Sequence, residues 1–186
     1  MESAKRYPHT FSATWALIKE DFKTHGSDRS RPGFRALAVH RFGEWALARP
    51  NRITQFIFRQ IFWTLHRYVR NHYGIEIMRG AQIGRRVIIA HQGCIAIHSG
   101  SKVGNNCLIR HCVTLGARSR KHSKSAPTLK NNVEVGVGAV IIGDVVIGQN
   151  AIIGANSVVT TDVPDNGIVI PPKPEIFVRR EMGDAH

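Results

Sequence analysis

Large aliphatic residues recur at every sixth position along the second half of the chain. From residue 129 onward they are Leu129, Val135, Ile141, Ile147, Ile153 and Val159. A smaller residue follows each of them by four positions, in the order Val133, Ala139, Val145, Ala151, Ser157 and Val163. The same period runs upstream through Ile77, Ile83, Ile89 and Ile95, and after a two-residue slip it resumes at Ile97, Val103, Ile109 and Leu115. A fixed short period of this kind indicates a repeat architecture.

The six-residue period predicts short strands that each bury one aliphatic side chain. Three such strands form a triangular coil, so about eighteen residues make one turn of a parallel β-helix. A β-sandwich would require two-residue alternation interrupted by turns every eight to twelve residues, and the sequence has no such pattern. We therefore expect a mainly β fold over residues 74–170.

Residues 1–73 have a different periodicity, with apolar residues three and four positions apart. The segments FSATWALIKEDFKTH, RPGFRALAVHRFGEWALA and RITQFIFRQIFWTLHRYVRNHYG predict three helices, with Pro32 and Pro50 as breakers. We expect an N-terminal helical domain, the β-helix, and a C-terminal tail over residues 171–186.

The third predicted helix is both aromatic and basic. Its aromatic residues are Phe56, Phe58, Phe62, Trp63 and Tyr68, and Arg52, Arg59, Arg67 and Arg70 lie among them. A helix of this composition can lie on an anionic membrane surface. We favour the alternative, in which the aromatic side forms the core of the helical domain.

The repeat is interrupted between Leu115 and Leu129. These residues are fourteen positions apart, whereas two hexads would take twelve. The intervening segment, GARSRKHSKSAPT at residues 116–128, is mostly polar and basic. It predicts a protruding loop, a place where functional groups are often carried on a rigid scaffold.

Two histidines occupy equivalent positions in the repeat. His91 follows Ile89 by two residues, and His111 follows Ile109 by two. Because Ile89 and Ile109 are separated by three hexads and the slip, the histidines should lie on successive coils, about 4.8 Å apart. A lone histidine in a strand is usually structural, but a stacked pair beside a loop indicates a functional site.

Composition limits the remaining possibilities. A chain of 186 residues can form one main domain with an appendage. The 26 Lys and Arg residues against 13 Asp and Glu give a net charge of +13. This surplus favours contact with nucleic acid, an acidic membrane, a phosphorylated cofactor or an acidic glycan.

The cysteines and the apolar segments bear on the cellular compartment. Cys94, Cys107 and Cys112 form neither a CxxC pair nor an even set, which argues against a disulfide framework and a structural zinc site. There is no N-terminal segment typical of a signal peptide and no apolar run near the length of a membrane span. We expect a cytoplasmic protein, with the inner face of the membrane as an alternative.

Four segments carry a resemblance to a known family: IEIMRGAQIGRRVIIAH, CVTLG, VEVGVGAVIIGDVVIG and AIIGANSVVTTDVPDN. They resemble the serine acetyltransferase family, hexapeptide-repeat enzymes that transfer acetyl from acetyl-CoA to a hydroxyl. The resemblance covers residues 74 to about 170 and extends weakly to DRSRPGFRALAVHRFGEW. It implies a left-handed coil, a homotrimer that can pair into a hexamer, and acetyl-CoA bound in the groove between subunits without a metal.

The resemblance also implies roles for individual residues. His91 matches the general base, and His111 would orient it or contact the acceptor. Asp28 falls near an aspartate that contacts the acceptor, and the alternative is that it is the N-cap of the second helix. The positions matching the acetyl-CoA site are Gly116, Ala117, Gly136, Gly138, Ala139 and Ala155, with Lys173 near a phosphate.

The chain departs from the serine enzymes at three places. Ala90 replaces the carboxylate that precedes the base, and Ser125, Ala126 and Pro127 replace an Arg-His-Pro that helps to hold the amino acid's carboxylate. Arg120 or His122 would have to compensate for that loss. The terminal EMGDAH lacks the isoleucine tail that such enzymes offer to cysteine synthase.

A closer likeness is to the colanic-acid, exopolysaccharide branch of the same family. That branch shares IGRR, a histidine without the preceding Asp, and IRH before VTLG. The likeness implies a sugar hydroxyl as the acetyl acceptor. We therefore expect a glycan O-acetyltransferase, with serine O-acetylation as the alternative.

Two other protein classes stay open. Hexapeptide-repeat carbonic anhydrases hold zinc with three histidines, and His91, His111 and either His98 or His122 could supply them, although the histidine spacing differs. A basic scaffold could bind nucleic acid or membrane through residues 56–72. Because that reading leaves the histidine pair and the loop unexplained, we expect no nucleic-acid partner.

Overall fold

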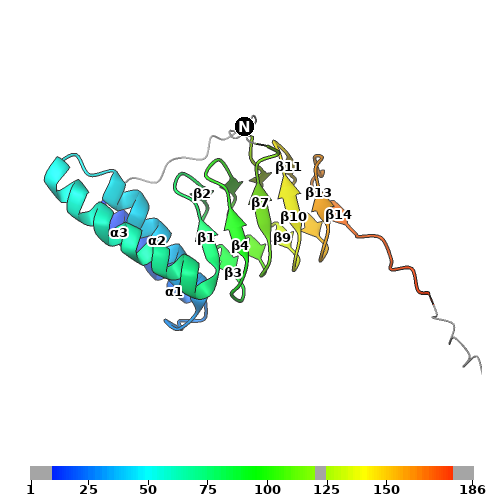
Figure 1. Cartoon of the computed structure of the whole chain (residues 1–186), viewed down its shortest axis with the longest axis horizontal. Helices are drawn as coiled ribbons and strands as arrows, with labels where there is room; N and C mark the ends of the chain where they lie inside the picture. The colour runs from blue at the N-terminus through cyan, green and yellow to red at the C-terminus, as the bar shows by residue number, and fades with distance from the viewer. Residues whose placement is uncertain (1–9, 120–124, 178–186) are drawn as a thin grey trace, which may run out of the picture.

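A computed structural model describes residues 10–119 and 125–177, as three helices followed by a column of short strands (Figure 1). The helices are α1 (Phe11–Thr24), α2 (Pro32–Leu47) and α3 (Arg52–Tyr73). Side-chain oxygens of Thr10 and Asn51 cap the first turns of α1 and α3, and Gly74 ends α3 in the left-handed conformation, at φ 64°. The three predicted helices are confirmed.

The strands stack into three parallel sheets that form the sides of a β-helix. The first sheet contains β1 (Ile75–Ile77), β4 (Ile95–Ile97), β7 (Thr114–Gly116), β10 (Val140–Ile142) and β13 (Val158–Val159), in that order. The second contains β2 (Gln82–Ile83), β5 (Lys102–Val103), β8 (Thr128–Leu129) and β11 (Val146–Ile147). The third contains β3 (Ile88–Ile89), β6 (Leu108–Ile109), β9 (Glu134–Val135), β12 (Ile152–Ile153) and β14 (Ile168–Val169). The expected parallel β-helix is confirmed.

The periodic aliphatic residues form the core of this coil. Ile97, Ile109, Ile141 and Ile147 have no exposed surface, and the smaller repeat residue Ala139 is equally buried. Burial of an aliphatic side chain of this size contributes roughly 1.5–3 kcal/mol. The repeat is therefore the main source of stability in the coil.

The two-residue slip of the repeat widens one corner of the first coil. Ile75 pairs with Ile95, a register of twenty residues, whereas Val140 pairs with Val158, a register of eighteen. The extra residues lie in the segment 90–94, where His91, Gly93 and Cys94 all have positive φ. The wider corner is the one that carries His91.

The interruption at the loop is larger than the sequence suggested. Leu115 lies in β7 and Leu129 in β8, which are successive strands. In the preceding coil the equivalent strands are joined by a single six-residue step, from Ile97 to Val103. Here the same step takes fourteen positions. The expectation that two hexads span this interval is wrong, because no strand forms between β7 and β8 in the described residues.

The aromatic side of α3 is divided between the core and the surface. Phe62 is buried and Phe58 is half-buried against α2, as expected of core residues. Phe56, Trp63 and Tyr68 are 55%, 40% and 50% exposed. Each residue advances about 100° around a helix, so these three fall outside the packed face. The prediction that the aromatic side forms core is wrong for them.

The open end of the coil is closed by side chains from the helices. The edge strands of the three sheets are β1, β2 and β3, which lie next to the helical domain. Each receives one basic side chain, from α3, α2 and the end of α1 respectively, and we call these side chains the cap residues. The contacts are His66 Nε2 to the Ile77 carbonyl (3.2 Å), Arg41 Nη1 to the Ile83 carbonyl (2.6 Å), and the Ile89 N–H to His25 Nε2 (3.3 Å). Unpaired edge strands attract foreign strands, so the cap residues protect this end.

No helix in the described ranges is long and apolar enough to cross a bilayer.

Candidate functional site

His91 and His111 lie together at one corner of the coil. The pairing of Ile89 with Ile109 in β3 and β6 brings the two residues into register. Their ring centroids are 5.5 Å apart and the rings are nearly perpendicular, at 88°. The His91 side chain is exposed and His111 is half-buried. One imidazole is thus open to solvent while the other supports it.

The backbone at His91 is unusual for its residue type. Its φ of 69° lies in the left-handed region, where the other coil corners mostly place asparagine. The Ala90 N–H donates to the Ile109 carbonyl at 2.8 Å on one side, and the Gly93 N–H donates to the Tyr73 carbonyl at 2.9 Å on the other. These bonds fix the corner that presents the imidazole. Sparsely populated backbone conformations that are held in this way cluster at functional sites.

Both imidazoles have nitrogen atoms available for chemistry. His111 Nδ1 is buried and has no hydrogen-bond partner in the part of the chain that the structure describes. Within the same ranges no carboxylate contacts the His91 ring, whose aromatic neighbour is His111. Ala90, where the family has a carboxylate, is half-buried. The pair can therefore accept a proton from a bound hydroxyl without a carboxylate partner among the described residues.

Three of the expected acetyl-CoA positions lie at the same corner, on later coils. Gly136, Gly138 and Ala155 follow β9 and β12, strands of the sheet that also contains β3 and β6. The Gly138 N–H donates to the His111 carbonyl at 3.1 Å. A Cβ at Gly138 would lie 2.2 Å from Asn156 Oδ1, so any larger residue there would have to displace the Asn156 side chain. The histidines therefore lie beside a surface of small residues, and Ala139 is buried behind it.

The other expected acetyl-CoA positions lie elsewhere. Gly116 is the last residue of β7, and Ala117 follows it. Because the His111 corner precedes β7, a whole strand separates Gly116 from the histidines of its own chain. Lys173 is exposed in the segment after β14. A single chain does not bring these positions to the histidine pair.

Asp28 lies in the turn between α1 and α2. Its Oδ1 accepts bonds from the Ser30 N–H (2.8 Å) and hydroxyl (2.6 Å), and Arg31 lies 3.5 Å from Oδ2. The Ser30 bonds lower the pKa of the Asp28 carboxyl. Arg31 is the N-cap of α2 and makes no side-chain cap bond, so the N-cap alternative for Asp28 is wrong. Over the described ranges, no hydrogen bond or ion pair joins Asp28 to either histidine.

The protruding loop is described only at its ends. Arg120 and His122 lie outside the described residues. Ser125 is half-buried, whereas Ala126 and Pro127 are buried. The segment that replaces Arg-His-Pro is therefore packed against the coil and not exposed on the loop.

His98 lies at a different corner from the histidine pair. It follows β4, and its Nδ1 accepts a bond from the Gly100 N–H at 3.1 Å. The described residues contain no group of three His, Cys, Asp or Glu side chains that could hold a metal ion.

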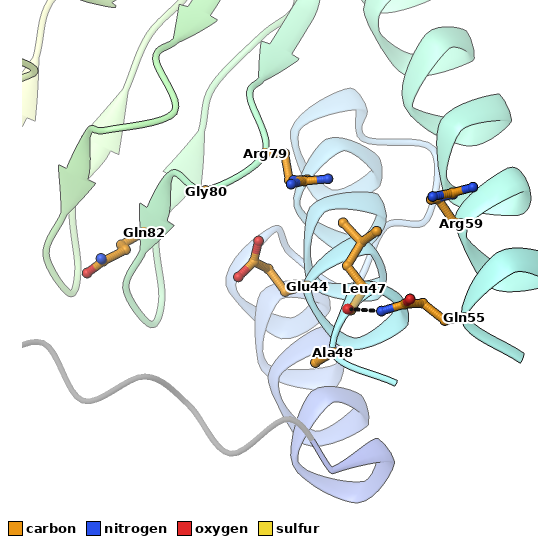
Figure 2. Close-up of a pocket in the computed structure, with 8 residues that line it drawn as sticks. All are labelled: Glu44, Leu47, Ala48, Gln55, Arg59, Arg79, Gly80 and Gln82. Carbon is orange, nitrogen blue, oxygen red and sulfur yellow. Dashed lines mark hydrogen bonds between the residues drawn. The ribbon is translucent and has the colours of Figure 1, made fainter. Parts of the chain in front are cut away.

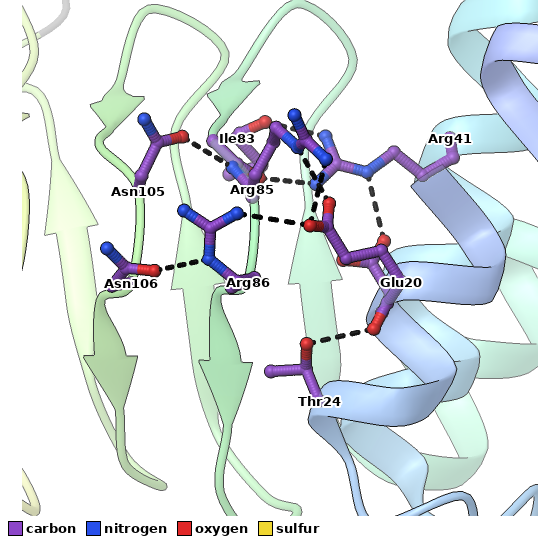
Figure 3. Close-up of polar contacts among 10 residues, drawn as sticks. Glu20, Thr24, Arg41, Ile83, Arg85, Arg86, Asn105 and Asn106 are labelled. Atoms are coloured by element: carbon purple, nitrogen blue, oxygen red, sulfur yellow. Dashed lines mark hydrogen bonds and ion pairs between the residues drawn. The ribbon is translucent and has the colours of Figure 1, made fainter. Parts of the chain in front are cut away.

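The two arginines of IGRR join the helical domain to the coil (Figure 3). Arg85 and Arg86 form ion pairs with Glu20 of α1, at 2.8 and 3.1 Å. On the next coil, Asn105 Oδ1 accepts a bond from the Arg85 backbone N–H, and Asn106 Oδ1 accepts one from Arg86 Nε. The Arg85 bond lowers the pKa of the Glu20 carboxyl, although burial opposes this shift. The motif is therefore structural in this chain.

A charged cavity of about 530 Å³ lies between α2, α3 and the corner from β1 to β2 (Figure 2). Glu44, Arg59 and Arg79 line it, and Gln55 donates to the Leu47 carbonyl at its edge (2.7 Å). None of its lining residues is one of the predicted site residues.

Two residues of the helical domain that support the site follow no pattern in the sequence. His25 and Gly33 contact Ile89, two residues before His91. His25 is 64 positions from Ile89 along the chain, and neither period links them. The only sequence signal was a histidine at the last position of a predicted helix.

Comparison with known proteins identifies close relatives. A family described as bacterial transferase hexapeptide (six repeats) matches residues 126–161. The chain is 39% identical over 139 residues to the serine acetyltransferase of Synechococcus elongatus, covering 75% of this chain and 54% of that protein. It is 36% identical over 162 residues to the serine acetyltransferase of Bacillus subtilis, covering 83% and 73%. The chain thus spans about half the length of the first relative and more of the second.

Solved structures agree with this comparison. Serine acetyltransferase isoform 3 of Entamoeba histolytica, in complex with cysteine, has a TM-score of 0.74 at 27% identity, covering 92% of this chain and 63% of that one. The Neisseria gonorrhoeae serine acetyltransferase in complex with serine has a TM-score of 0.68 at 25% identity, with coverage of 88% and 68%.

These relatives overturn the expected acceptor. All of them are named for serine, so the expectation of a sugar hydroxyl is contradicted, and the alternative reading, serine, is favoured. The structure gives a reason for the error. IGRR, part of the evidence for the exopolysaccharide branch, binds Glu20 and the next coil, so it carries no information about the acceptor.

Proposed function

Because this chain belongs to the serine acetyltransferase family, we propose that it transfers the acetyl group of acetyl-CoA to the hydroxyl of L-serine. The products are O-acetylserine and free CoA. The observation that carries the proposal is the pair of facing imidazoles, His91 and His111, whose ring centroids are 5.5 Å apart at an exposed corner. The names and ligands of the relatives supply the substrate.

His91 is the proposed general base. Its imidazole takes the proton of the serine hydroxyl as the oxygen attacks the carbonyl carbon of the thioester. The carbon–sulfur bond then breaks, and the imidazolium returns the proton to the CoA sulfur. Proton transfer of this kind typically contributes about 10²–10⁴-fold in rate. Exposure of the His91 ring favours this role over that of its half-buried partner.

His111 is the proposed orienting residue in place of the missing carboxylate at Ala90. Its perpendicular ring restricts the His91 imidazole, and its buried Nδ1 has hydrogen-bonding capacity to spare within the described ranges. For the rest of the serine molecule we propose Asp28 as the partner of the ammonium and Arg120 or His122 as that of the carboxylate. A carboxylate is held most firmly by such cationic donors.

We propose that acetyl-CoA lies along the small-residue surface at Gly136, Gly138 and Ala155, with Lys173 near a phosphate. Gly116 and Ala117, the remaining positions, are a strand's length from the histidines of the same chain. A homotrimer would let one subunit's β7 end face another subunit's histidine corner, and we propose that assembly. Its mass in solution should be three times the 20.7 kDa of one chain, measured by light scattering.

A peripheral membrane contact through α3 is a further proposal about partners. Ile53, Ile57 and Ile61 form an exposed row along the helix, with exposed fractions of 72%, 50% and 44%. The helix contains four arginines and no acidic residue, so an anionic bilayer suits this face better than a second copy of it. Cosedimentation with phosphatidylserine vesicles should be lost in I57D/I61D. Equal sedimentation of the variant and the wild type would reject the contact.

The function is tested by release of CoA thiol from acetyl-CoA with L-serine, with D-serine, and without an acceptor. We expect release that depends on L-serine, and a fall of at least about a hundredfold in kcat for H91A. His98, at another corner, is the matched control, and H98A should stay within threefold of the wild type. Release with L-serine at the rate without an acceptor would refute the function, and H91A activity within a few-fold of wild type would refute the base.

A further inference from the structure

We propose that His25 is a positioning residue for His91. Its imidazole holds the end of β3 from beneath, and thereby fixes the corner on which His91 is presented. The inference rests on the proposed role of His91 as the base of the reaction.

The backbone of β3 needs a partner on its outer side. The Ile88 and Ala90 N–H groups donate to the Cys107 and Ile109 carbonyls across to β6, at 2.9 and 2.8 Å. The Ile89 N–H points the other way, where the sheet has no further strand. His25 Nε2 accepts this bond at 3.3 Å. A histidine ring thus replaces the missing strand, two residues before His91.

The His25 ring is itself held in one orientation and one tautomer. It is 6% exposed, and its Nδ1–H donates to the Asp21 carbonyl at 2.7 Å. The Phe34 ring of α2 lies 6.5 Å away, centroid to centroid. Because Nδ1 is committed as a donor, Nε2 carries the lone pair that Ile89 requires. The contact therefore needs the neutral imidazole.

A second contact clamps the same residue. Gly33 of α2 lies so close to Ile89 that a Cβ at Gly33 would be 2.1 Å from the Ile89 carbonyl oxygen. The N–H and the carbonyl of Ile89 are therefore both in contact with the helical domain. A shift of the C-terminal end of α1 or of the N-terminal end of α2 would therefore move the backbone that leads into the His91 corner.

The charged groups around His25 are few. The Asp21 carboxylate, one turn earlier in α1, is paired with Arg41 Nε of α2 at 3.1 Å, and both side chains are buried. The neighbouring Glu20 pairs instead with Arg85 and Arg86 of the coil. β3 itself contributes no titratable side chain, because it consists of Ile88 and Ile89. Protonation of His25 would place two donors, Nε2–H and the Ile89 N–H, face to face and break the contact.

The test compares H25F with H25Q. Phenylalanine keeps a ring of similar size but has no acceptor, whereas the glutamine side-chain oxygen can take the place of Nε2. We expect H25F to lower kcat by roughly 10- to 100-fold, the usual effect of misplacing a catalytic group by about 1 Å. The KM values for L-serine and acetyl-CoA should stay within twofold, and H25Q should restore kcat to within threefold of wild type.

The matched control is H66F. His66 caps an edge strand in the same way, through the Ile77 carbonyl, but β1 does not lead into the His91 corner. Its kcat should stay within twofold of wild type. The proposal is overturned if H25F keeps kcat within twofold, if H25Q falls as far as H25F, or if H66F falls equally.

Hydrogen exchange separates this inference from the proposed function. The Ile89 amide should exchange faster in H25F than in wild type and H25Q, whatever the substrate. If wild type does not acetylate L-serine, the proposed function fails, and this exchange experiment alone decides whether His25 holds β3. Equal exchange in the three proteins would overturn that role.

Discussion

Substitution of Gly33 by alanine tests whether α2 rests directly on the strand that leads to His91. Gly33 is the second residue of α2, after Pro32. An ideal Cβ there would lie 2.1 Å from the Ile89 carbonyl oxygen and 2.9 Å from the Ile89 Cβ. The first of these atoms belongs to the backbone of a buried strand, so it cannot rotate away.

Two opposing effects set the size of the change. Alanine in a helix is favoured over glycine by roughly 0.5–1 kcal/mol. Overpacking a well-packed interior costs typically about 1–3 kcal/mol, and a backbone contact belongs at the upper end of that range. We expect a net loss of about 2 kcal/mol. For a chain of this length that corresponds to a fall in Tm of about 4–8 °C.

Thermal unfolding followed by circular dichroism measures this change. Gly116→Ala is the matched control, because a Cβ there would meet its nearest side-chain atom at an ordinary 3.5 Å. Its Tm should stay within about 2 °C of wild type. A G33A protein as stable as wild type would show that α2 is not seated against β3.

Three further predictions concern titratable groups. Burial lowers the pKa of His40 to about 3, so only the unfolded chain takes up its proton between about pH 6.5 and 3. Stability should therefore fall with acid by up to about 1.4 kcal/mol per pH unit in that window, and urea midpoints should vary less with pH in H40Q. Asp21→Asn leaves a buried arginine unpaired and should lower the urea-derived free energy of unfolding by about 3–5 kcal/mol, whereas a loss under 1 kcal/mol would contradict the buried pair. Burial raises the pKa of the Cys107 thiol to about 11, so a thiol reagent at pH 8 should label two exposed cysteines in the native protein, Cys94 and Cys112, and Cys107 only after denaturation, as mass spectrometry would show.

The β-helix could be predicted from the sequence because a large aliphatic residue fills the interior at nearly every six-residue step of the coil. The repeat length also predicted that His91 and His111 lie at one corner, because it determines which residues stack on successive coils. The size of the loop insertion was misjudged, because a polar segment without strands gives no period to count. His25 was missed because its partner is a backbone N–H 64 residues away, and no side-chain pattern marks such a contact.

The acceptor was the least predictable part of the site. Ala90, Ser125 and Ala126 show which side chains of the serine acetyltransferase site are missing from this chain. They do not show which residues take over those roles. Arg85 and Arg86 have the charge and exposure expected of a binding site, yet their partner is Glu20. Long-range ion pairs of this kind leave no trace in local sequence, so only the fold can separate them from ligand contacts.

The cap residues also bear on how the chain reaches its folded state during synthesis. The helices leave the ribosome before any strand, so the first coil meets a surface that already offers His25, Arg41 and His66 to its three strands. Each later coil then pairs with the one made just before it, at separations of sixteen to twenty residues, or twenty-six across the loop. Such short-range pairing folds by propagation from a starting unit. The helical domain would then act as a template that sets the direction of assembly, from the amino end outward.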